Sequence, residues 1–169
     1  MAAATRLENH MKFRFPIVII DEDFRSENTS GLGIRALAQA IEVEGFEVVG
    51  VTSYGDMSQF AQQQSRASAF ILSIDDEEFS HGDDIDPVVL NLRNFIDEVR
   101  RKNSDVPIYI YGETKTSRHL PNDILRELHG FIHMFEDTPE FVARHIIREA
   151  KSYLEGVQPP FFKALLDYA

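Results

Sequence analysis

The sequence predicts an α/β fold in which a five-stranded parallel sheet lies between two layers of helices. Two observations predict this class. Five short apolar runs rich in Val and Ile alternate with longer segments whose apolar residues recur at helical spacing. The first run, residues 17–20, is entirely apolar, too short for a helix, and bounded by Pro16 and by acids. Such a run is typical of a strand buried on both faces, and strands that alternate with helices form parallel sheets.

The predicted strands are short β-branched, aliphatic or aromatic runs that end at polar turns. They cover residues 15–20, 46–52, 69–74, 106–111 and 131–135. The first strand ends in Asp21, Glu22 and Asp23, and the third ends in a second acidic run that begins at Asp75.

The predicted helices cover residues 31–44, 57–66, 88–101, 122–128 and 139–154, and residues 114–120 are predicted to form a loop. We expect Thr29 or Ser30 to cap the first helix at its N-terminus and Gly45 to end it. Thr138 should cap the last helix, which has a proline in its first turn and which Gly156 should close.

Right-handed crossovers between parallel strands limit the possible strand orders. The best-fitting order is 2-1-3-4-5, that of the flavodoxin-like or response-regulator-receiver-like three-layer sandwich. In this order the first and third strands are neighbours. We therefore expect Asp21, Asp23 and Asp75 to lie close together at the carboxyl edge of the sheet, where open α/β sheets bind their ligands.

The composition excludes several classes of function. The chain has 169 residues, 43% of them hydrophobic, which suits one domain with one core. Its formal net charge is −11, from 28 acidic and 17 basic residues, which opposes binding to nucleic acid. No apolar run approaches the ~20 residues that span a bilayer. The chain has no cysteine, so we expect no disulfide framework and a cytoplasmic location.

Asp21, Asp23 and Asp75 are weak candidates for Mg²⁺ ligands, because hard cations prefer oxygen donors. Receiver domains combine such acids with a hydroxyl after the fourth strand and a lysine after the fifth in order to accept a phosphoryl group. Thr114 offers the hydroxyl, but two acids follow the fifth strand in place of a lysine. The sequence therefore predicts a receiver-shaped fold with a degenerate phospho-acceptor pocket and no catalytic residue.

Two other sites are disfavoured. Residues 26–33 form a Ser/Thr/Gly loop like those that hold a flavin phosphate, but nearby acids repel phosphate and no tryptophan is available for stacking. His129 and His133 are four residues apart, but Gly130 and the fifth strand separate them, and no carboxylate completes a zinc site. We therefore expect no bound cofactor in this chain.

Apolar side chains gather again after a Pro-Pro pair near the C-terminal end of the sequence. Phe161, Phe162, Leu165 and Leu166 would form an apolar stripe on a helix. Burying such side chains is worth roughly 1.5–3 kcal/mol each. We expect this stripe to dock on another domain or subunit, and the alternative is that it folds back on this same domain.

Residues 106–169 resemble the end of the N-terminal wing domain, and its linker, in bacterial ornithine/lysine/arginine decarboxylases of the pyridoxal-phosphate fold-type I group. The most specific piece is PPFFKAL at residues 159–165, which is similar to the family's Leu-Pro-Pro-x-x-Lys-Ala-Leu junction. The resemblance extends back to about residue 15. It implies a receiver-like wing domain at 13–156 and the start of a linker to a catalytic domain at 157–169. Residues 1–12 lie outside the resemblance, and because the first ten have no helical or strand period we expect a flexible leader or an expression remnant there.

The resemblance implies a parent enzyme that removes CO₂ from a basic amino acid, with pyridoxal phosphate as the electron sink. For this chain it implies a non-catalytic role in which the wing contacts its own catalytic domain and other subunits of a homo-oligomer, a dimer or a decamer. In some lysine-specific members of the family the boundary between wing and core also binds the alarmone guanosine tetraphosphate, which makes Arg126 the candidate contact here. The other interpretation, which we favour, is that Arg126 is an ordinary surface arginine. The alternative is a stand-alone receiver-like signalling or partner-binding domain with a degenerate phospho-acceptor pocket.

Overall fold

The computed structural model describes residues 15–55, 67–74 and 87–157. The predicted leader at 1–12, the predicted helix at 57–66 and Asp75 lie outside these ranges. The side chains expected to dock on another domain also lie outside them: Phe161, Phe162, Leu165 and Leu166.

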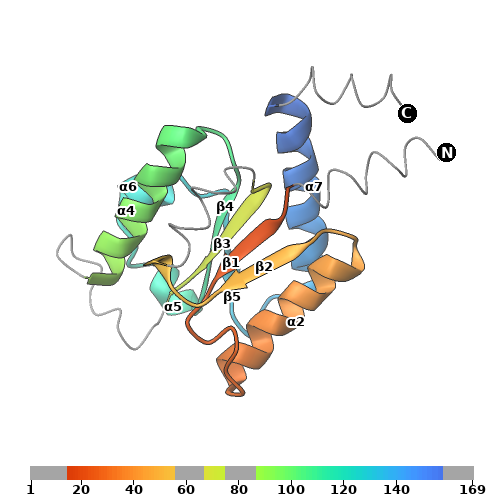
Figure 1. The fold of residues 1–169 in the computed structure, drawn as a ribbon. Coiled ribbons are helices and arrows are strands. Elements are labelled where there is room, and N and C mark those ends of the chain that lie inside the picture. The colour runs from red at the N-terminus through yellow and green to blue at the C-terminus, as the bar shows by residue number, and fades with distance from the viewer. Residues whose placement is uncertain (1–14, 56–66, 75–86, 158–169) are drawn as a thin grey trace, which may run out of the picture.

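A five-stranded parallel sheet has the order β2-β1-β3-β4-β5, which confirms the predicted topology (Figure 1). Its strands are β1 (Ile17–Ile20), β2 (Val48–Val51), β3 (Ala69–Ser73), β4 (Ile108–Gly112) and β5 (Gly130–His133). In the central register Ile19 lies between Gly50 of β2 and Ile71 of β3. The carboxyl ends of β1 and β3 are therefore neighbours, as expected from the predicted strand order.

Helices cover both faces of the sheet (Figure 1). They are α2 (Thr29–Val43), α4 (Pro87–Lys102), α5 (Thr114–Ser117), α6 (Asn122–Leu125) and α7 (Pro139–Val157). The helices α2 and α7 pack on one face, and α4 and α6 pack on the other. No helix among the described residues has the length and apolar character that a membrane crossing requires.

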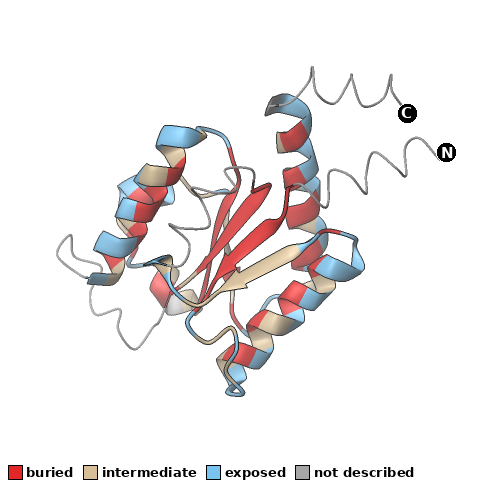
Figure 2. Ribbon diagram, viewed as in Figure 1, coloured by how far each residue is buried: buried red, intermediate tan, exposed pale blue. Residues whose placement is uncertain are grey.

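The two core layers meet at β1, which is buried on both faces (Figure 2). Ile17 and Ile19 join the apolar cluster with α2 and α7, whereas Val18 and Ile20 join the cluster with α4. None of the four is more than 2% exposed. Each such side chain contributes roughly 1.5–3 kcal/mol to folding through burial. The edge strand β2 is only partly buried.

The first helix begins earlier than predicted. Asn28 caps α2, and its Oδ1 accepts a hydrogen bond of 2.8 Å from the Gly31 N–H. The prediction of Thr29 or Ser30 as the cap was therefore wrong, because the side chain of Asn28, the residue before Thr29, accepts the hydrogen bond from the Gly31 N–H. Gly45 has φ 97°, which confirms the predicted left-handed residue after this helix.

The second half of the chain differs from prediction at four elements. The predicted loop at 114–120 contains the short helix α5. The strand β5 ends at His133, two residues before the predicted end, and Phe135 just beyond it has φ 67°, which is not a strand conformation. The helix α7 continues through Gly156, which does not close it. The predicted helix at 122–128 stops at Leu125.

Arg100 joins α4 to the segments on either side of β4. Its Nε lies 2.7 Å from Glu127 Oε2, and its Nη2 donates to the Glu127 carbonyl at 2.9 Å. Its Nη1 donates to the Val106 carbonyl at 2.9 Å. The side chain is 15% exposed, so these charge-assisted bonds are partly shielded from water.

We predict that Arg100→Ala lowers the free energy of unfolding by about 2–3 kcal/mol, because two backbone carbonyls and a carboxylate lose their donor. Urea unfolding followed by circular dichroism measures this loss. The control is Arg101→Ala, since Arg101 is exposed on the same helix and its replacement should change stability by less than about 0.5 kcal/mol. Equal losses in both variants would contradict a structural role for Arg100.

A second prediction concerns Gly31, where a Cβ would lie 2.1 Å from the Ser26 carbonyl oxygen and 2.5 Å from that of Asp23. We expect Gly31→Ala to destabilise the chain by about 1–3 kcal/mol, because backbone atoms must move. Gly156→Ala is the matched helical control, since a Cβ there meets nothing within 4 Å. It should stabilise the chain by roughly 0.5–1 kcal/mol. Stabilisation by both variants would show that the loop before α2 relaxes freely.

Candidate functional site

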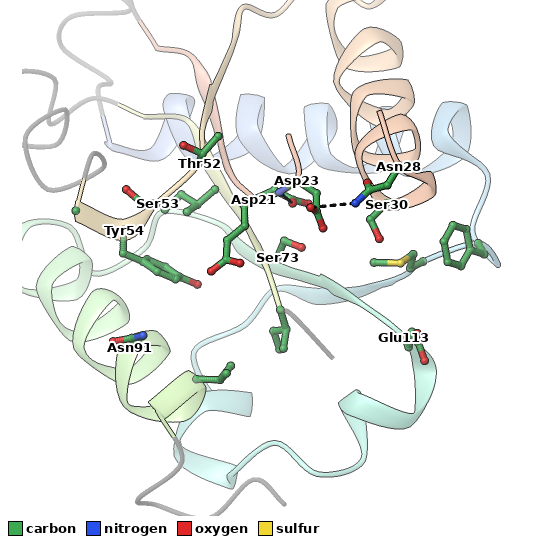
Figure 3. A pocket seen from close by; sticks show the side chains of 17 residues that line it. Asp21, Asp23, Asn28, Ser30, Thr52, Ser53, Tyr54, Ser73, Asn91 and Glu113 are labelled. Atoms are coloured by element: carbon green, nitrogen blue, oxygen red, sulfur yellow. Dashed lines mark hydrogen bonds between the residues drawn. The ribbon is translucent and has the colours of Figure 1, made fainter. Parts of the chain in front are cut away.

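The carboxyl ends of β1 and β3 open into a polar hollow of about 640 Å³ (Figure 3). Its lining includes side chains from the loops after β1, β2 and β4 and from the N-terminal ends of α2 and α4. Those that carry polar or charged groups include Asp21, Asp23, Tyr54, Ser73, Asn91 and Glu113. The hollow lies where ligands bind in other open α/β sheets.

Asp21 is the first residue after β1, and the strand carries it into the buried floor of this hollow. It is 4% exposed, and its N–H donates to the Val51 carbonyl of β2 at 3.0 Å. Its Oδ1 accepts a hydrogen bond of 2.7 Å from the Asp23 N–H. Asp23 Oδ1 in turn accepts from the Asn28 Nδ2 at 3.1 Å. The end of β1 therefore places two carboxylates together and links them to the cap of α2.

The carboxylates make the local potential negative. Burial, followed by the nearby Asp21 carboxylate, raises the pKa of Tyr111 to about 12. Burial also raises the pKa of Tyr54 far above its usual value, with further contributions from Glu22 and Asp21. Tyr54 and Asp21 extend toward each other in Figure 3. A site with this potential favours cations and repels phosphate groups.

The receiver-type phosphoryl site is not assembled within the described residues. No Lys or Arg is among the residues that line the hollow, and Met134 and Phe135 occupy its wall after β5. Thr114 does not line the hollow, because its hydroxyl donates to Glu136 Oε2 at 2.6 Å and lies 3.3 Å from His133 Nδ1. Glu113 lies at the hollow in its place and adds a further negative charge.

The predicted metal ligands are brought together only in part. Asp21 and Asp23 share the hollow, while Asp75 lies outside the described residues. Across residues 15–55, 67–74 and 87–157, no group of three or more His, Asp or Glu side chains is arranged to hold a metal ion. His129 and His133 do not converge, since His129 Nδ1 accepts a hydrogen bond from the Ile108 N–H at 3.4 Å and His133 contacts Thr114.

Arg126 lies away from this hollow, exposed at the C-cap of α6. The neighbouring residue Asp123 on the same helix forms a two-bond ion pair with Arg93 of α4, at 2.7 and 3.2 Å. This pair lowers the pKa of the Asp123 carboxyl, chiefly through the hydrogen bonds from Arg93. The pair links α6, the helix that precedes Arg126, to α4.

Of the polar residues named above, sequence reasoning missed four: Tyr54, Ser73, Asn91 and Glu113. Glu113 follows β4 directly, and the same rule that selected Asp21 after β1 would have selected it. Asn91 is the polar member of an otherwise apolar turn of α4, which is a weak signal. Tyr54 carries no signal in the sequence pattern, since it follows β2 in a turn.

Comparison with known proteins agrees with the resemblance found in the sequence. Residues 29–153 match the model of the family described as "Orn/Lys/Arg decarboxylase, N-terminal domain". The chain is 27% identical, over 92% of its length, to lysine decarboxylase LdcA of Pseudomonas aeruginosa. It is 24% identical, over 90% of its length, to the biodegradative arginine decarboxylase of Escherichia coli. It spans about a fifth (20%) of the length of each.

Solved structures give the same result. The structure of lysine decarboxylase A from Pseudomonas aeruginosa superimposes with a TM-score of 0.76 at 26% identity, covering 92% of this chain and 20% of that one. A response regulator receiver domain from Clostridium thermocellum superimposes with a TM-score of 0.55 at 11% identity, covering 82% of this chain and 95% of that one. The second likeness shows a receiver-like fold alone. The family match covers most of the described sheet and its helices, and the chain therefore belongs to the family of Orn/Lys/Arg decarboxylase N-terminal domains.

Proposed function

We propose that this chain is a non-catalytic accessory domain that helps to assemble a pyridoxal-phosphate-dependent decarboxylase of a basic amino acid. The observation that carries the proposal is the family match over residues 29–153, together with relatives named as lysine and arginine decarboxylases. Lysine, arginine and ornithine are all admissible substrates of the parent enzyme. The homo-oligomer is a dimer or a decamer.

The described residues do not fit pyridoxal phosphate. The cofactor needs a lysine for the Schiff base and positive or backbone donors for its phosphate. The hollow at the carboxyl edge is lined by Asp21, Glu22, Asp23 and Glu113 and has no Lys or Arg among its described lining. We therefore assign the cofactor, and the electron sink that it supplies, to another part of the parent protein.

The division of the sequence follows from the same proposal. We infer a leader at residues 1–12, the wing domain at 13–156, and at 157–169 the first part of a linker to the cofactor-binding domain. The apolar stripe of the linker would pack on that domain: Phe161, Phe162, Leu165 and Leu166. Arg126 remains the candidate residue for contact with an alarmone effector, because its position at the end of α6 is exposed.

The second candidate function is a stand-alone receiver-like domain that signals or binds partners. The likeness to receiver structures and the pair Asp21 and Asp23 at the carboxyl edge favour it. Two features weigh against phosphoryl transfer in this pocket. Glu113 makes its wall acidic, and Phe135 lies where a cation is needed.

Beryllofluoride separates the two functions, since it mimics a phosphoryl group on an aspartate. We expect the NMR amide signals of residues 21–23, and of those after Asp75, to keep the positions they have with Mg²⁺ alone when beryllofluoride is added. The reason is that no described cation is placed to neutralise the added charge. A saturable shift of these signals would support the receiver function and contradict the degenerate pocket.

The docking role of the linker is tested in the parent enzyme. We expect Phe161→Asp combined with Leu165→Asp to reduce the oligomer mass measured by light scattering, because charged side chains cannot be buried unpaired at an interface. The control is Val43→Asp, at a side chain that is 79% exposed on α2. An intact oligomer in the double variant would rule out docking through this stripe.

A further inference from the structure

We infer that α7 is a contact surface between two copies of this chain, which pack these helices antiparallel across a two-fold axis near Arg144. The inference rests on the proposed assembly role and deepens it by naming a surface and its occupant. It comes from three features of α7: an exposed aromatic ring, a groove beside that ring, and a self-complementary order of charges.

The outward face of α7 carries a large apolar side chain among charges. The helix buries Val142, Ile146 and Ala150 against the sheet and α2. On its opposite face Phe141 is 69% exposed. In the ribbon of Figure 2, exposed residues alternate with buried ones along α7. Single exposed apolar side chains are common on protein surfaces, so the ring supports an interface only together with the groove beside it and the charges around it.

A groove of about 210 Å³ lies beside Phe141, between α7 and the edge strand β5. Its walls include Phe131 of β5 and His145 of α7, and Tyr109 of β4 lies in it as well. The groove therefore joins apolar and polar surface at the edge of the sheet. A side chain from a second molecule would bury area here that is exposed in the single domain.

Charges along the same face change sign at mid-helix. Asp137 and Glu140 stand at the start, and both are exposed. Arg144, Arg148 and Lys151 follow at spacings that place them on one exposed stripe. The N-terminal end of the stripe, with Asp137 just before the helix and Glu140 in its first turn, is therefore negative, the middle of α7 is positive, and the exposed Glu155 lies beyond this positive part.

Because of this order, the stripe on one copy is complementary in charge to the same stripe on a second copy that runs in the opposite direction. In an antiparallel pair centred on Arg144, residues equally far before and after Arg144 face each other. Glu140 of one copy then faces Arg148 of the other, and Asp137 faces Lys151. Each contact occurs twice because of the two-fold symmetry. At the axis Arg144 of each copy meets its own counterpart, and each guanidinium can turn onto the second copy's Phe141, about one turn away, where stacking on the ring offsets the like-charge contact.

Charge exchange tests the pairing directly. The 169-residue chain should show concentration-dependent dimerisation by sedimentation velocity. Glu140→Arg alone and Arg148→Glu alone should each weaken dimerisation by about ten-fold or more, because like charges then face each other twice. An equimolar mixture of the two variants should dimerise like the wild type, since both contacts become attractive again in the mixed pair. Arg101→Glu on α4 is the control and should change nothing.

A cross-link provides a second measurement that does not depend on charge. The chain has no cysteine, so Arg144→Cys creates a single thiol near the proposed axis. Mild oxidation should give a disulfide-linked dimer from Arg144→Cys and none from the control Arg101→Cys. Circular dichroism confirms that each variant folds.

A wild-type chain that stays monomeric at all concentrations, or a mixture that dimerises no better than its components, would overturn the inference. The proposed assembly role is tested separately, by the double variant in the linker. If the charge variants have no effect while the Phe161 and Leu165 double variant dissociates the parent enzyme, α7 is not the surface and the assembly role remains.

Discussion

The burial of β1 on both faces is the constraint on which the rest of the structure depends. A strand with Ile17 and Ile19 on one side and Val18 and Ile20 on the other must lie inside a sheet with helices above and below it. The chain can leave that interior only at the ends of the strand. Asp21 is the first polar residue after β1, so the carboxylate pair is placed at the carboxyl edge by the same apolar run that builds the core.

The chemistry of that edge follows from what the neighbouring segments contribute. Glu22 and Glu113 add negative charge beside Asp21, and the chain after β5 contributes Met134 and Phe135 to the wall. A receiver pocket needs a cation at this place, because a phosphoryl group adds negative charge next to carboxylates. The fold therefore has the shape of a receiver, whereas the charges at its carboxyl edge oppose phosphoryl transfer. This agrees with membership of a family of decarboxylase N-terminal domains, whose chemistry we place elsewhere in the parent protein.

The fold was predictable because its signals are local. The apolar run of β1 and the 3.6-residue spacing of Leu92, Phe95 and Val99 on α4 each depend on burial of one continuous segment. Gly45 was predictable for the same reason, since a left-handed residue after a helix favours glycine. The cap of α2 was not, because three consecutive residues at 28–30 have side chains that can cap a helix and only geometry selects Asn28.

The candidate site was predictable only where a strand end fixes the position of a residue. Asp21 and Asp23 follow directly from the end of β1. The position of Thr114 depends on a hydrogen bond to Glu136, 22 residues further along the chain, and the role of Arg100 depends on Glu127. Such long-range polar contacts leave no periodic pattern in a single sequence. The outward face of α7 could not be predicted for the same reason. Its charges indicate a contact surface only once the structure shows that they are exposed on one side of the helix.

We propose that this domain assembles its parent enzyme and takes no part in the chemistry. The most direct test is to remove residues 1–157 from the parent and to measure, on the same sample, the mass of the particle and the rate of decarboxylation per cofactor. The account predicts a smaller particle that still releases CO₂ from its basic amino acid at a comparable rate per pyridoxal phosphate. An oligomer of unchanged size, or a particle of full cofactor content with no decarboxylation, would contradict it.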